Sequence, residues 1–271
     1  MYLGSNEKLN KLVNYIEENI TEPIVYEKLA RILAVNEYTL HRIFLFVTNM
    51  SIPEYIRKRR MTLAATDLIK GELKIIDIAV KYQYDSATSF ARAFKKIMGF
   101  NPSDIKKNKN LIKVFPVLKF EHISEETKDI EYKEVQNYSI ILYGVGRKMK
   151  IKDIPKEAPS LWKEQISSNE ELFDQTQYGV VEYNNVLVEE TDEAIYYVCT
   201  TKDFEGSKRI EIKNKNYLAF KLNSQNPEEI SEFTKKMYNL IIFDLKYNID
   251  NSPDIEEYIG NDTYIYIAIK K

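Results

Sequence analysis

The chain of 271 residues has few of the residue types on which several specialised protein classes depend. Cys199 is its one cysteine, which excludes an internal disulfide and a cysteine-based metal cluster. Eight glycines and eight prolines are too few for long low-complexity segments. No stretch approaches the ~18 apolar residues of a membrane-spanning helix, and the first residues, 1–4, do not resemble a signal peptide. We therefore expect a cytoplasmic protein with no membrane partner.

Positive charge is concentrated in the first part of the chain and negative charge in the rest, although the net charge is only −2. Residues 1–110 contain 18 Lys and Arg against 12 Asp and Glu, a net charge of +6, whereas residues 111–271 contain 21 against 29, a net charge of −8. A length near 270 residues also favours two domains. The basic part suits a polyanion, and the acidic part could suit a cationic ligand.

The basic part has a helical pattern and an internal repeat. With an offset of 50, Leu40, Arg42 and Phe44 align with Phe90, Arg92 and Phe94. The spacing predicts two helix–turn–helix units joined by an amphipathic helix over 53–70. The polar segment 106–110 indicates a linker after them. We expect a DNA-binding domain over 1–107, a linker over 108–113 and a second domain over 114–271.

Each helix–turn–helix unit places its second helix in the major groove of DNA. These recognition helices are predicted at Glu37–Thr48 and Ser86–Met98. One turn into them, Arg42 and Arg92 could reach guanine O6 and N7, whereas Lys95 and Lys96 suit phosphates. The candidate DNA-contacting residues are Asn36, Glu37, Tyr38, His41, Arg42, Ser86, Ala87, Thr88, Ser89, Arg92, Lys95 and Lys96.

Several segments resemble the AraC/XylS family of transcriptional regulators. They are Leu29-Ala30, residues 38–44, residues 53–60, Ile78-Ala79, residues 89–95 and Gly99-Phe100-Asn101-Pro102-Ser103. The resemblance implies two recognition helices in successive major grooves, with double-stranded DNA and RNA polymerase as partners. The chain departs from the family at Ala34 and Gln83, where the turns usually have glycine. Because Ala87 and Ala91 are small, the second helix is expected to read fewer bases than the first.

Some residues of the basic part have more than one interpretation. Three interpretations are open for Arg57, Arg59 and Arg60: they form a solvated helix face, they contact phosphates, or they brace the two helix–turn–helix units. His41 reads bases or is a neutral surface residue. Phe44, Phe90 and Phe94 recur on the inner helix faces, so we assign them to the core rather than to stacking on bases.

After residue 110 the hydrophobic period changes to two, which is typical of strands. The predicted strands are Ile130–Gln136, Ser139–Arg147, Gly179–Asn184, Ala194–Thr200, Arg209–Lys213, Tyr217–Leu222, Asp254–Ile259 and Tyr264–Ile269. Helical patterns occur at Pro159–Ser167 and Pro227–Tyr247. The fold class is therefore multidomain: an all-α double helix–turn–helix domain followed by an α+β domain with duplicated βαββ-type halves.

The acidic part has 13 Tyr, 7 Phe and Trp162, and few catalytic resources. It lacks a glycine-rich phosphate loop, a metal-ligand cluster and a Ser-His-Asp arrangement, so we expect no enzyme, cofactor or metal. Glu256 and Tyr258 share one strand face, and Tyr264 and Tyr266 face away from the isoleucines of the last strand. We expect this Tyr/Glu face to form a wet cleft for a lipophilic cation. The alternative is that these tyrosines only reflect β-propensity.

Short segments of this part are similar to the GyrI-like effector-binding domain. They are residues 159–162, 179–183, 217–220, 253–258 and 265–269. The resemblance implies a small-molecule effector held by a buried glutamate, which Glu256 matches best. The candidate ligand-binding residues are Glu256, Tyr258, Trp162, Glu182, Tyr264 and Tyr266. Two alternatives stay open: a hydrolase in which Glu256 and Tyr258 activate water, and a protein-interaction module without a ligand.

Overall fold

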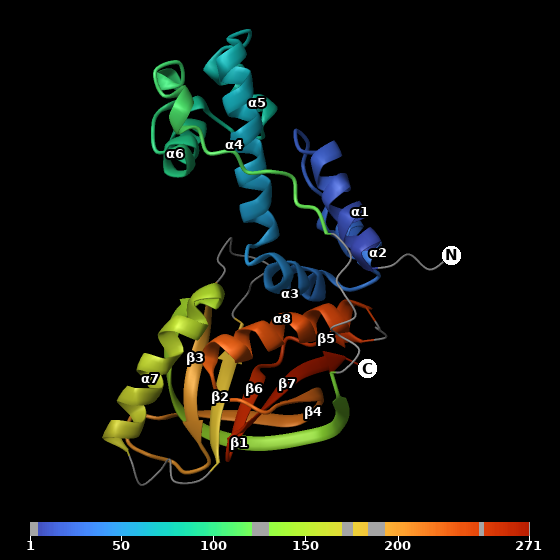
Figure 1. Ribbon diagram of the computed structural model, residues 1–271, viewed down its shortest axis with the longest axis vertical. Helices are drawn as coiled ribbons and strands as arrows, with labels where there is room; N and C mark the ends of the chain where they lie inside the picture. Colours follow the sequence, from blue (N-terminus) through green and yellow to red (C-terminus); the bar gives the residue numbers. More distant parts are fainter. Residues whose placement is uncertain (1–4, 121–129, 170–175, 184–192, 244–246, 271) are drawn as a thin grey trace. The chain divides into compact units, whose positions relative to one another are not determined.

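The structure, a computed structural model, describes residues 5–120, 130–169, 176–183, 193–243 and 247–270 (Figure 1). Backbone contacts divide the chain into two compact units. Unit 1 comprises Met1–Ala34 and Ile52–Ile123, and unit 2 comprises Val35–Ser51 and Ser124–Lys271. The first recognition helix therefore groups with the C-terminal part of the chain. Within the described residues, no helix is long and apolar enough to cross a membrane.

Unit 1 is all-helical. Its helices are α1 (Ser5–Glu18), α2 (Tyr26–Leu33), α4 (Ile52–Lys70), α5 (Ile75–Lys81) and α6 (Ala87–Met98), followed by the short 3₁₀ helices η1 (Pro102–Asp104) and η2 (Lys109–Leu111). Helices α4, α5 and α6 share one hydrophobic core that contains Phe90, Phe94 and Met98. The assignment of Phe90 and Phe94 to the core is confirmed, because both side chains are fully buried.

The turns of the helix–turn–helix units use left-handed backbone conformations at non-glycine residues. Ala34 has φ 59° and Gln83 has φ 63°, at the two positions where the family resemblance predicts glycine. Each costs on the order of 1 kcal/mol relative to glycine. Asn49 (φ 56°) and Gly99 (φ 93°) cap the two recognition helices in the same conformation. The turn geometry is therefore kept despite the substitutions.

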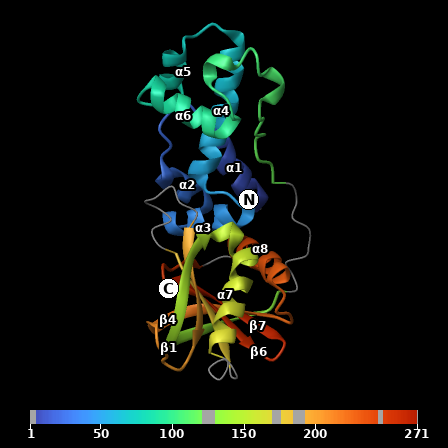
Figure 2. The same cartoon turned by 90° about the vertical axis from the view of Figure 1, so that its left-hand side faces the viewer.

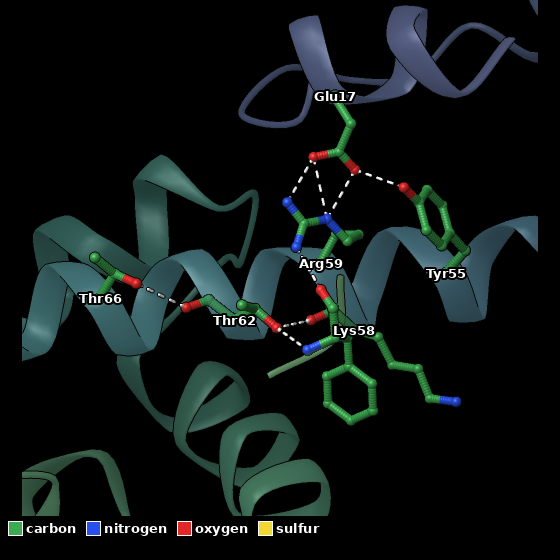
Figure 3. A network of polar contacts seen from close by, with 7 residues as sticks. Glu17, Tyr55, Lys58, Arg59, Thr62 and Thr66 are labelled. Carbon is green, nitrogen blue, oxygen red and sulfur yellow. Dashed lines mark hydrogen bonds and ion pairs between the residues drawn. The ribbon is translucent and has the colours of Figure 1, made fainter. Parts of the chain in front are cut away.

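A network of polar contacts ties α4 to α1 (Figure 3). The Glu17 carboxylate accepts hydrogen bonds from Arg59 Nε and Nη2 at 2.8–3.1 Å and from the Tyr55 hydroxyl at 2.8 Å. Arg60 Nε donates to the backbone carbonyl of Ile20 at 2.8 Å. Of the alternatives for these arginines, bracing is what the structure shows for Arg59 and Arg60.

The segment after η2 is also anchored to unit 1. Arg59 Nη1 donates to the carbonyl of Phe115, whose backbone N–H donates to Thr62 Oγ1 at 3.1 Å. Asn10 exchanges two hydrogen bonds with the backbone of Phe120, at 2.8 and 2.9 Å. By contacts, residues 114–120 thus belong with unit 1, beyond the boundary that the composition suggested.

Unit 2 is a sheet covered by helices. It contains α3 (Glu37–Thr48), α7 (Ile154–Ser168, preceded by η4, Ile151–Asp153) and α8 (Pro227–Phe243). Its strands are β1 (Tyr132–Lys150), β2 (Gln177–Glu182), β3 (Glu193–Thr200), β4 (Lys208–Leu222), β5 (Asn248–Ile249), β6 (Asp254–Ile259) and β7 (Asp262–Lys270). All pairings are antiparallel, in the order β4-β1-β3-β2-β6-β7-β5, and an additional β4–β7 pairing closes six of the strands into a ring.

Two long strands replace two predicted pairs of short ones. β1 runs through the interval between the strands predicted at 130–136 and 139–147, and β4 runs through the interval at 214–216. Asn137 (φ 56°) and Asn214 (φ 52°) allow this, because each forms an irregularity within a continuous strand. The Asn214 N–H donates a hydrogen bond to Ser139 Oγ of β1 at 3.0 Å. Of the other predicted elements, residue 184 and residues 244–246 lie outside the described residues.

The two faces of the ring have different cores. The enclosed face receives side chains from all six ring strands, among them Leu142, Val180, Cys199 and Tyr217. The outer face carries α7 and α8, which lie over the same side of the sheet in both views (Figures 1 and 2). Its core includes Leu161 of α7 and Tyr196 and Val198 of β3. The space between the outer face and its helices contains the candidate effector site.

Candidate effector-binding site

A cavity of about 560 Å³ lies inside unit 2, between the strands and the helices. Its strand wall comes from β2, β3, β6 and β7, and includes Val181, Ile265 and Ile267. Helix α7 contributes Trp162, α8 contributes Ile230 and Thr234, and α3 contributes Leu45 and Phe46. This volume is within the range of sites that enclose small organic ligands. The cavity is thus large enough for a drug-sized molecule, and its walls are mostly apolar.

Glu256 of β6 places a carboxylate in this cavity. Its Oε2 accepts hydrogen bonds from the Tyr196 hydroxyl at 2.6 Å and the Tyr258 hydroxyl at 2.7 Å. Trp162 Nε1 in turn donates to the Tyr196 hydroxyl at 3.0 Å, and the Trp162 ring meets the Tyr258 ring edge-on at 5.3 Å between centroids. The acid is therefore surrounded by aromatic rings and oriented by two phenols.

Burial changes the acid–base behaviour of this group. Loss of hydration raises the pKa of Glu256 above its ordinary value, although the hydrogen bonds from Tyr196 and Tyr258 act in the opposite direction. Burial, together with the nearby carboxylate, raises the pKa of Tyr196 and of Tyr258. Both phenols stay protonated and act as donors to Glu256. An ionised Glu256 would lack a full counter-charge, which a cationic ligand could supply.

Asp254, two residues before Glu256, also lines the cavity but has a cationic partner. Its carboxylate forms a two-pronged ion pair with Arg42 of α3, which includes an Nη1–Oδ1 contact of 3.3 Å. The Arg42 and Asp254 side chains are 1% and 6% exposed. Burial alone would lower the pKa of Arg42, but the Asp254 carboxylate raises it, so the guanidinium stays charged.

Three of the six predicted ligand residues line the cavity. Trp162, Glu256 and Tyr258 are brought together as expected. The prediction that Tyr264 and Tyr266 lie on the same sheet face as Glu256 is wrong. Glu256 of β6 is paired with Ile265 of β7, and directly opposed residues point to the same side of a sheet, so the flanking tyrosines point to the other side. Ile265 and Ile267 of β7 lie beneath the helices as predicted, and they also line the cavity.

Glu182 and the two tyrosines of β7 lie on the enclosed face instead. Tyr266 donates to Glu257 at 2.6 Å, and Tyr264 packs against the enclosed core. Glu182 accepts from the hydroxyl of Tyr197, a residue of that same core, at 3.0 Å. The assignment of Glu182 to the cleft is therefore corrected: Val181, its neighbour, faces the cavity.

Sequence reasoning missed several cavity residues. Tyr196 and Asp254 could have been found from strand phase, because both alternate with residues of the enclosed face. Leu45 and Phe46 carried no such signal. They belong to a helix that the sequence assigned to a different domain.

The two predicted recognition helices differ in exposure. In α6, Thr88, Ser89, Arg92, Lys95 and Lys96 are exposed, while Ser86 and Ala87 are half-buried. In α3, Glu37 is exposed, Asn36 and Tyr38 are half-buried, and His41 and Arg42 are buried. Burial lowers the pKa of His41 to about 4. The exposure that base reading requires is thus present in α6, and it is missing at His41 and Arg42 in this arrangement.

Contacts within unit 2 explain the burial of α3. The Asn36 N–H donates to Asn248 Oδ1 at 3.0 Å, and Thr39 Oγ1 accepts from the Ile249 N–H at 2.9 Å. Phe46 stacks on Tyr238 of α8 with ring centroids 4.0 Å apart. The expectation that the first recognition helix is the better placed of the two to read bases is not met in this structure, because α3 packs against β5 and α8.

Comparison with known proteins agrees with these two kinds of site. Residues 29–108 match the family model of a helix-turn-helix domain. Residues 131–269, just over half of the chain, match the model of the integron-associated effector binding proteins. The chain belongs to this family. The effector-binding protein carries an AraC-type helix-turn-helix domain ahead of its Cass2/GyrI-like domain, as the sequence resemblance indicated.

Relatives of the helix-turn-helix part are transcriptional regulators. The activator AarP of Providencia stuartii is 38% identical over 95 residues, which are 35% of this chain and 70% of AarP. The regulatory protein SoxS of Salmonella typhimurium strain LT2 is 35% identical over 102 residues, 38% of this chain and 95% of SoxS. This effector-binding protein is accordingly a DNA-binding transcriptional regulator of the AraC family.

The chain is similar to an integron cassette protein, VCH_CASS2, from Vibrio cholerae. The sequence identity is 16% and the TM-score is 0.43, over 52% of this chain and 95% of the cassette protein.

Proposed function

We propose that this regulator responds to a lipophilic organic cation bound in the cavity of unit 2. The observation that carries the proposal is the Glu256 carboxylate, held by two phenols inside a largely apolar cavity. Desolvation makes an unpaired carboxylate costly, and a cation with an apolar body would relieve that cost. The rings of Trp162, Tyr196 and Tyr258 add cation–π attraction. A neutral ligand would gain only the apolar contacts.

The test uses two ions of nearly identical shape and opposite charge, tetraphenylphosphonium and tetraphenylborate. Trp162 is the one tryptophan of the chain and lines the cavity, so its fluorescence reports binding. We expect the phosphonium to change the emission of Trp162 with saturation and the borate to leave it unchanged. Glu256→Gln, which keeps the shape and removes the charge, should weaken phosphonium binding at least about tenfold. Equal binding of both ions would refute the proposal.

We further propose that α6 contacts bases through Ser86, Ala87, Thr88, Ser89 and Arg92, with Lys95 and Lys96 on phosphates. The exposure of its charged side chains supports this assignment. Asn36, Glu37, Tyr38, His41 and Arg42 remain candidates for a second groove, which α3 would reach once His41 and Arg42 are exposed. Contact with RNA polymerase and a cytoplasmic location are part of the same proposal, in keeping with a transcriptional regulator.

Unit 2 is also proposed to be a duplication of a strand–helix–strand–strand half. Exchanging β1, β2 and β3 with β4, β6 and β7 reproduces the cyclic strand order of the ring. Helices α7 and α8 then occupy equivalent positions, after the first strand of each half. Both helices line the cavity, and β5 is an addition to the second half.

A hydrolase is the second candidate, because Tyr258 lies 2.7 Å from Glu256 and the pair could activate water. Incubating the purified chain with an activated aryl ester tests it. Product formation that disappears in both Glu256→Gln and Tyr258→Phe would establish turnover, while an unchanged ester would leave the cavity as a receptor.

A further inference from the structure

Arg42 occupies a site with the composition of a receptor for an organic cation. Its guanidinium carbon lies 3.8 Å from the ring centroid of Tyr183 and 5.2 Å from that of Tyr238. The rings of Phe46 and Tyr38 are at 5.7 and 5.8 Å. With the carboxylate of Asp254, these four rings form what we call the Asp254 cage. Aromatic rings around a carboxylate are the arrangement by which proteins bind guanidinium and ammonium groups.

The Asp254 cage opens on the effector cavity. Asp254, Tyr183 and Phe46 line this cavity together with Glu256. Asp254 and Glu256 alternate on β6, so their side chains share one face and their backbone positions are about 7 Å apart. On β6 the cavity wall therefore presents two carboxylates, those of Asp254 and Glu256. A cationic side chain of the protein itself, Arg42, neutralises Asp254, whereas Glu256 accepts its hydrogen bonds from the phenols of Tyr196 and Tyr258.

The pairing of Arg42 is incomplete. Among the buried side-chain nitrogen and oxygen atoms of the described residues, Arg42 Nε is the one without a hydrogen-bond partner. An unsatisfied buried donor makes this arrangement less favourable than a fully paired one. A ligand cation that needed fewer hydrogen bonds would fill the cage without that penalty. Because Asp254 is already desolvated, exchanging one cation for another requires no further desolvation of the acid.

We propose that the Asp254 cage is a second cation subsite of the effector cavity, which a dicationic effector fills by displacing Arg42. One charged group of such a ligand would lie at Glu256 and the other, an amidinium, guanidinium or ammonium group, at Asp254. This inference rests on the proposed effector site at Glu256. Displacement returns Arg42, a candidate base-reading residue of α3, to the protein surface, so the effector and the recognition helix compete for one carboxylate.

Competition predicts a specific pattern of ligand affinities. The probes are 4-(aminomethyl)benzamidine, whose two cationic groups are separated by one benzene ring, and benzamidine, its monocationic counterpart. Calorimetry on the full chain should show tighter binding of the dication. Arg42→Gln removes the internal competitor, and it should raise the affinity for the dication about tenfold or more. An unchanged affinity in Arg42→Gln would overturn the displacement.

A double variant guards against misfolding. Arg42→Gln leaves Asp254 without a counter-charge, whereas Arg42→Gln combined with Asp254→Asn removes both charges of the pair. In this double variant the dication should lose its advantage over benzamidine. If the advantage persists, the second charge binds elsewhere and the subsite assignment is wrong.

Chemical labelling measures the displacement directly. Phenylglyoxal modifies exposed arginines, and peptide mass spectrometry gives the rate at each site. Arg42 should be protected in the free protein, and saturating dication should raise its rate at least tenfold, while the exposed Arg92 serves as internal control. Benzamidine should leave Arg42 protected. Protection of Arg42 in the presence of bound dication would overturn the inference.

The two proposals fail separately. If phosphonium binding depends on Glu256 but Arg42 stays protected from phenylglyoxal in the presence of the dication, the effector site is retained and the second subsite is rejected. Labelling of Arg42 in the presence of the dication, with no phosphonium binding, retains the Asp254 cage as a cation site and rejects the role of Glu256.

Discussion

Gly179 lies directly opposite Glu256 across the β2–β6 pairing. A Cβ atom at Gly179 would come within 2.6 Å of Glu256 Oε2 and 2.4 Å of the Tyr196 hydroxyl. Such distances are below van der Waals contact, so any other residue at this position displaces at least one of these groups. The absence of a side chain at 179 is what lets the carboxylate and the phenol meet at 2.6 Å.

Gly179→Ala should therefore weaken cation binding without removing the carboxylate. The alanine methyl group forces Glu256 Oε2 and the Tyr196 hydroxyl apart, and a hydrogen bond to a charged group contributes about 1.5–3 kcal/mol. We expect a loss of affinity for tetraphenylphosphonium of at least about tenfold in the Trp162 fluorescence titration. Tyr264→Phe, on the other face of the sheet, is the control and should bind normally. Normal affinity in Gly179→Ala would show that this contact does not position the acid.

Cation binding should depend on pH through Glu256. Burial raises the pKa of this group above the ordinary 4.5. The ionised form binds the cation, so affinity is full above the raised pKa and is lost as the pH falls through it. The midpoint should lie above 4.5, and Glu256→Gln should abolish the pH dependence assigned to this residue. A midpoint at or below the ordinary value would contradict the desolvation of Glu256. Burial raises the pKa of Asp254 as well, and this carboxylate faces the same cavity. Asp254→Asn therefore tests whether Asp254 contributes to the pH dependence.

DNA binding through α6 should separate base contacts from phosphate contacts. Arg92→Ala should lower affinity for the cognate site by about 1–3 kcal/mol and relax the base preference at one position. Lys96→Ala should weaken cognate and random DNA alike and reduce the salt dependence of binding. Electrophoretic or anisotropy titrations at several salt concentrations measure both. If Arg92→Ala affects cognate and random DNA equally, Arg92 is a phosphate contact.

The stability of unit 1 should depend on the ion pair between Arg59 and Glu17, which are 9% and 18% exposed. Arg59→Ala leaves the carboxylate with only the Tyr55 hydroxyl among the contacts described above, and the loss of one partner of a largely buried pair costs about 3 kcal/mol. Arg31→Ala is the matched control, because the Arg31–Glu27 pair is 73% and 63% exposed and should contribute less than about 1 kcal/mol. Thermal unfolding followed by helical circular dichroism compares the two. Equal melting temperatures would show that Arg59 does not brace α4.

Helix periods and strand phases were readable from the sequence because they are local. The recognition helix at Glu37–Thr48 was predicted with its observed bounds, and the left-handed caps at Asn49 and Gly99 follow from residue type. Glu256 and Tyr258 were placed on one face of β6 for the same reason, since alternation is a property of any extended strand.

Pairing between strands was not readable in this way. Tyr264 and Tyr266 were grouped with Glu256 because all are polar or aromatic, but the tight turn between β6 and β7 places Ile265 opposite Glu256. The closure of the ring by β4 and β7 joins residues about 50 positions apart, and no local pattern encodes it. The burial of Arg42 was missed for a related reason: its partner Asp254 is 212 residues away in the chain.

The closed ring of strands has a mechanical consequence for the cavity. Every ring strand is hydrogen-bonded on both sides, so widening one seam would stretch the whole circuit, and the strand wall is stiff. The opposite wall consists of helices attached mainly by side-chain packing, which yields more easily. An oversized ligand would therefore push outward on α3, α7 and α8 instead of deforming the sheet. Of these three, α3 is the helix that also belongs to the DNA-binding motif. The wall that yields most easily to a ligand therefore includes the helix whose displacement would change DNA binding.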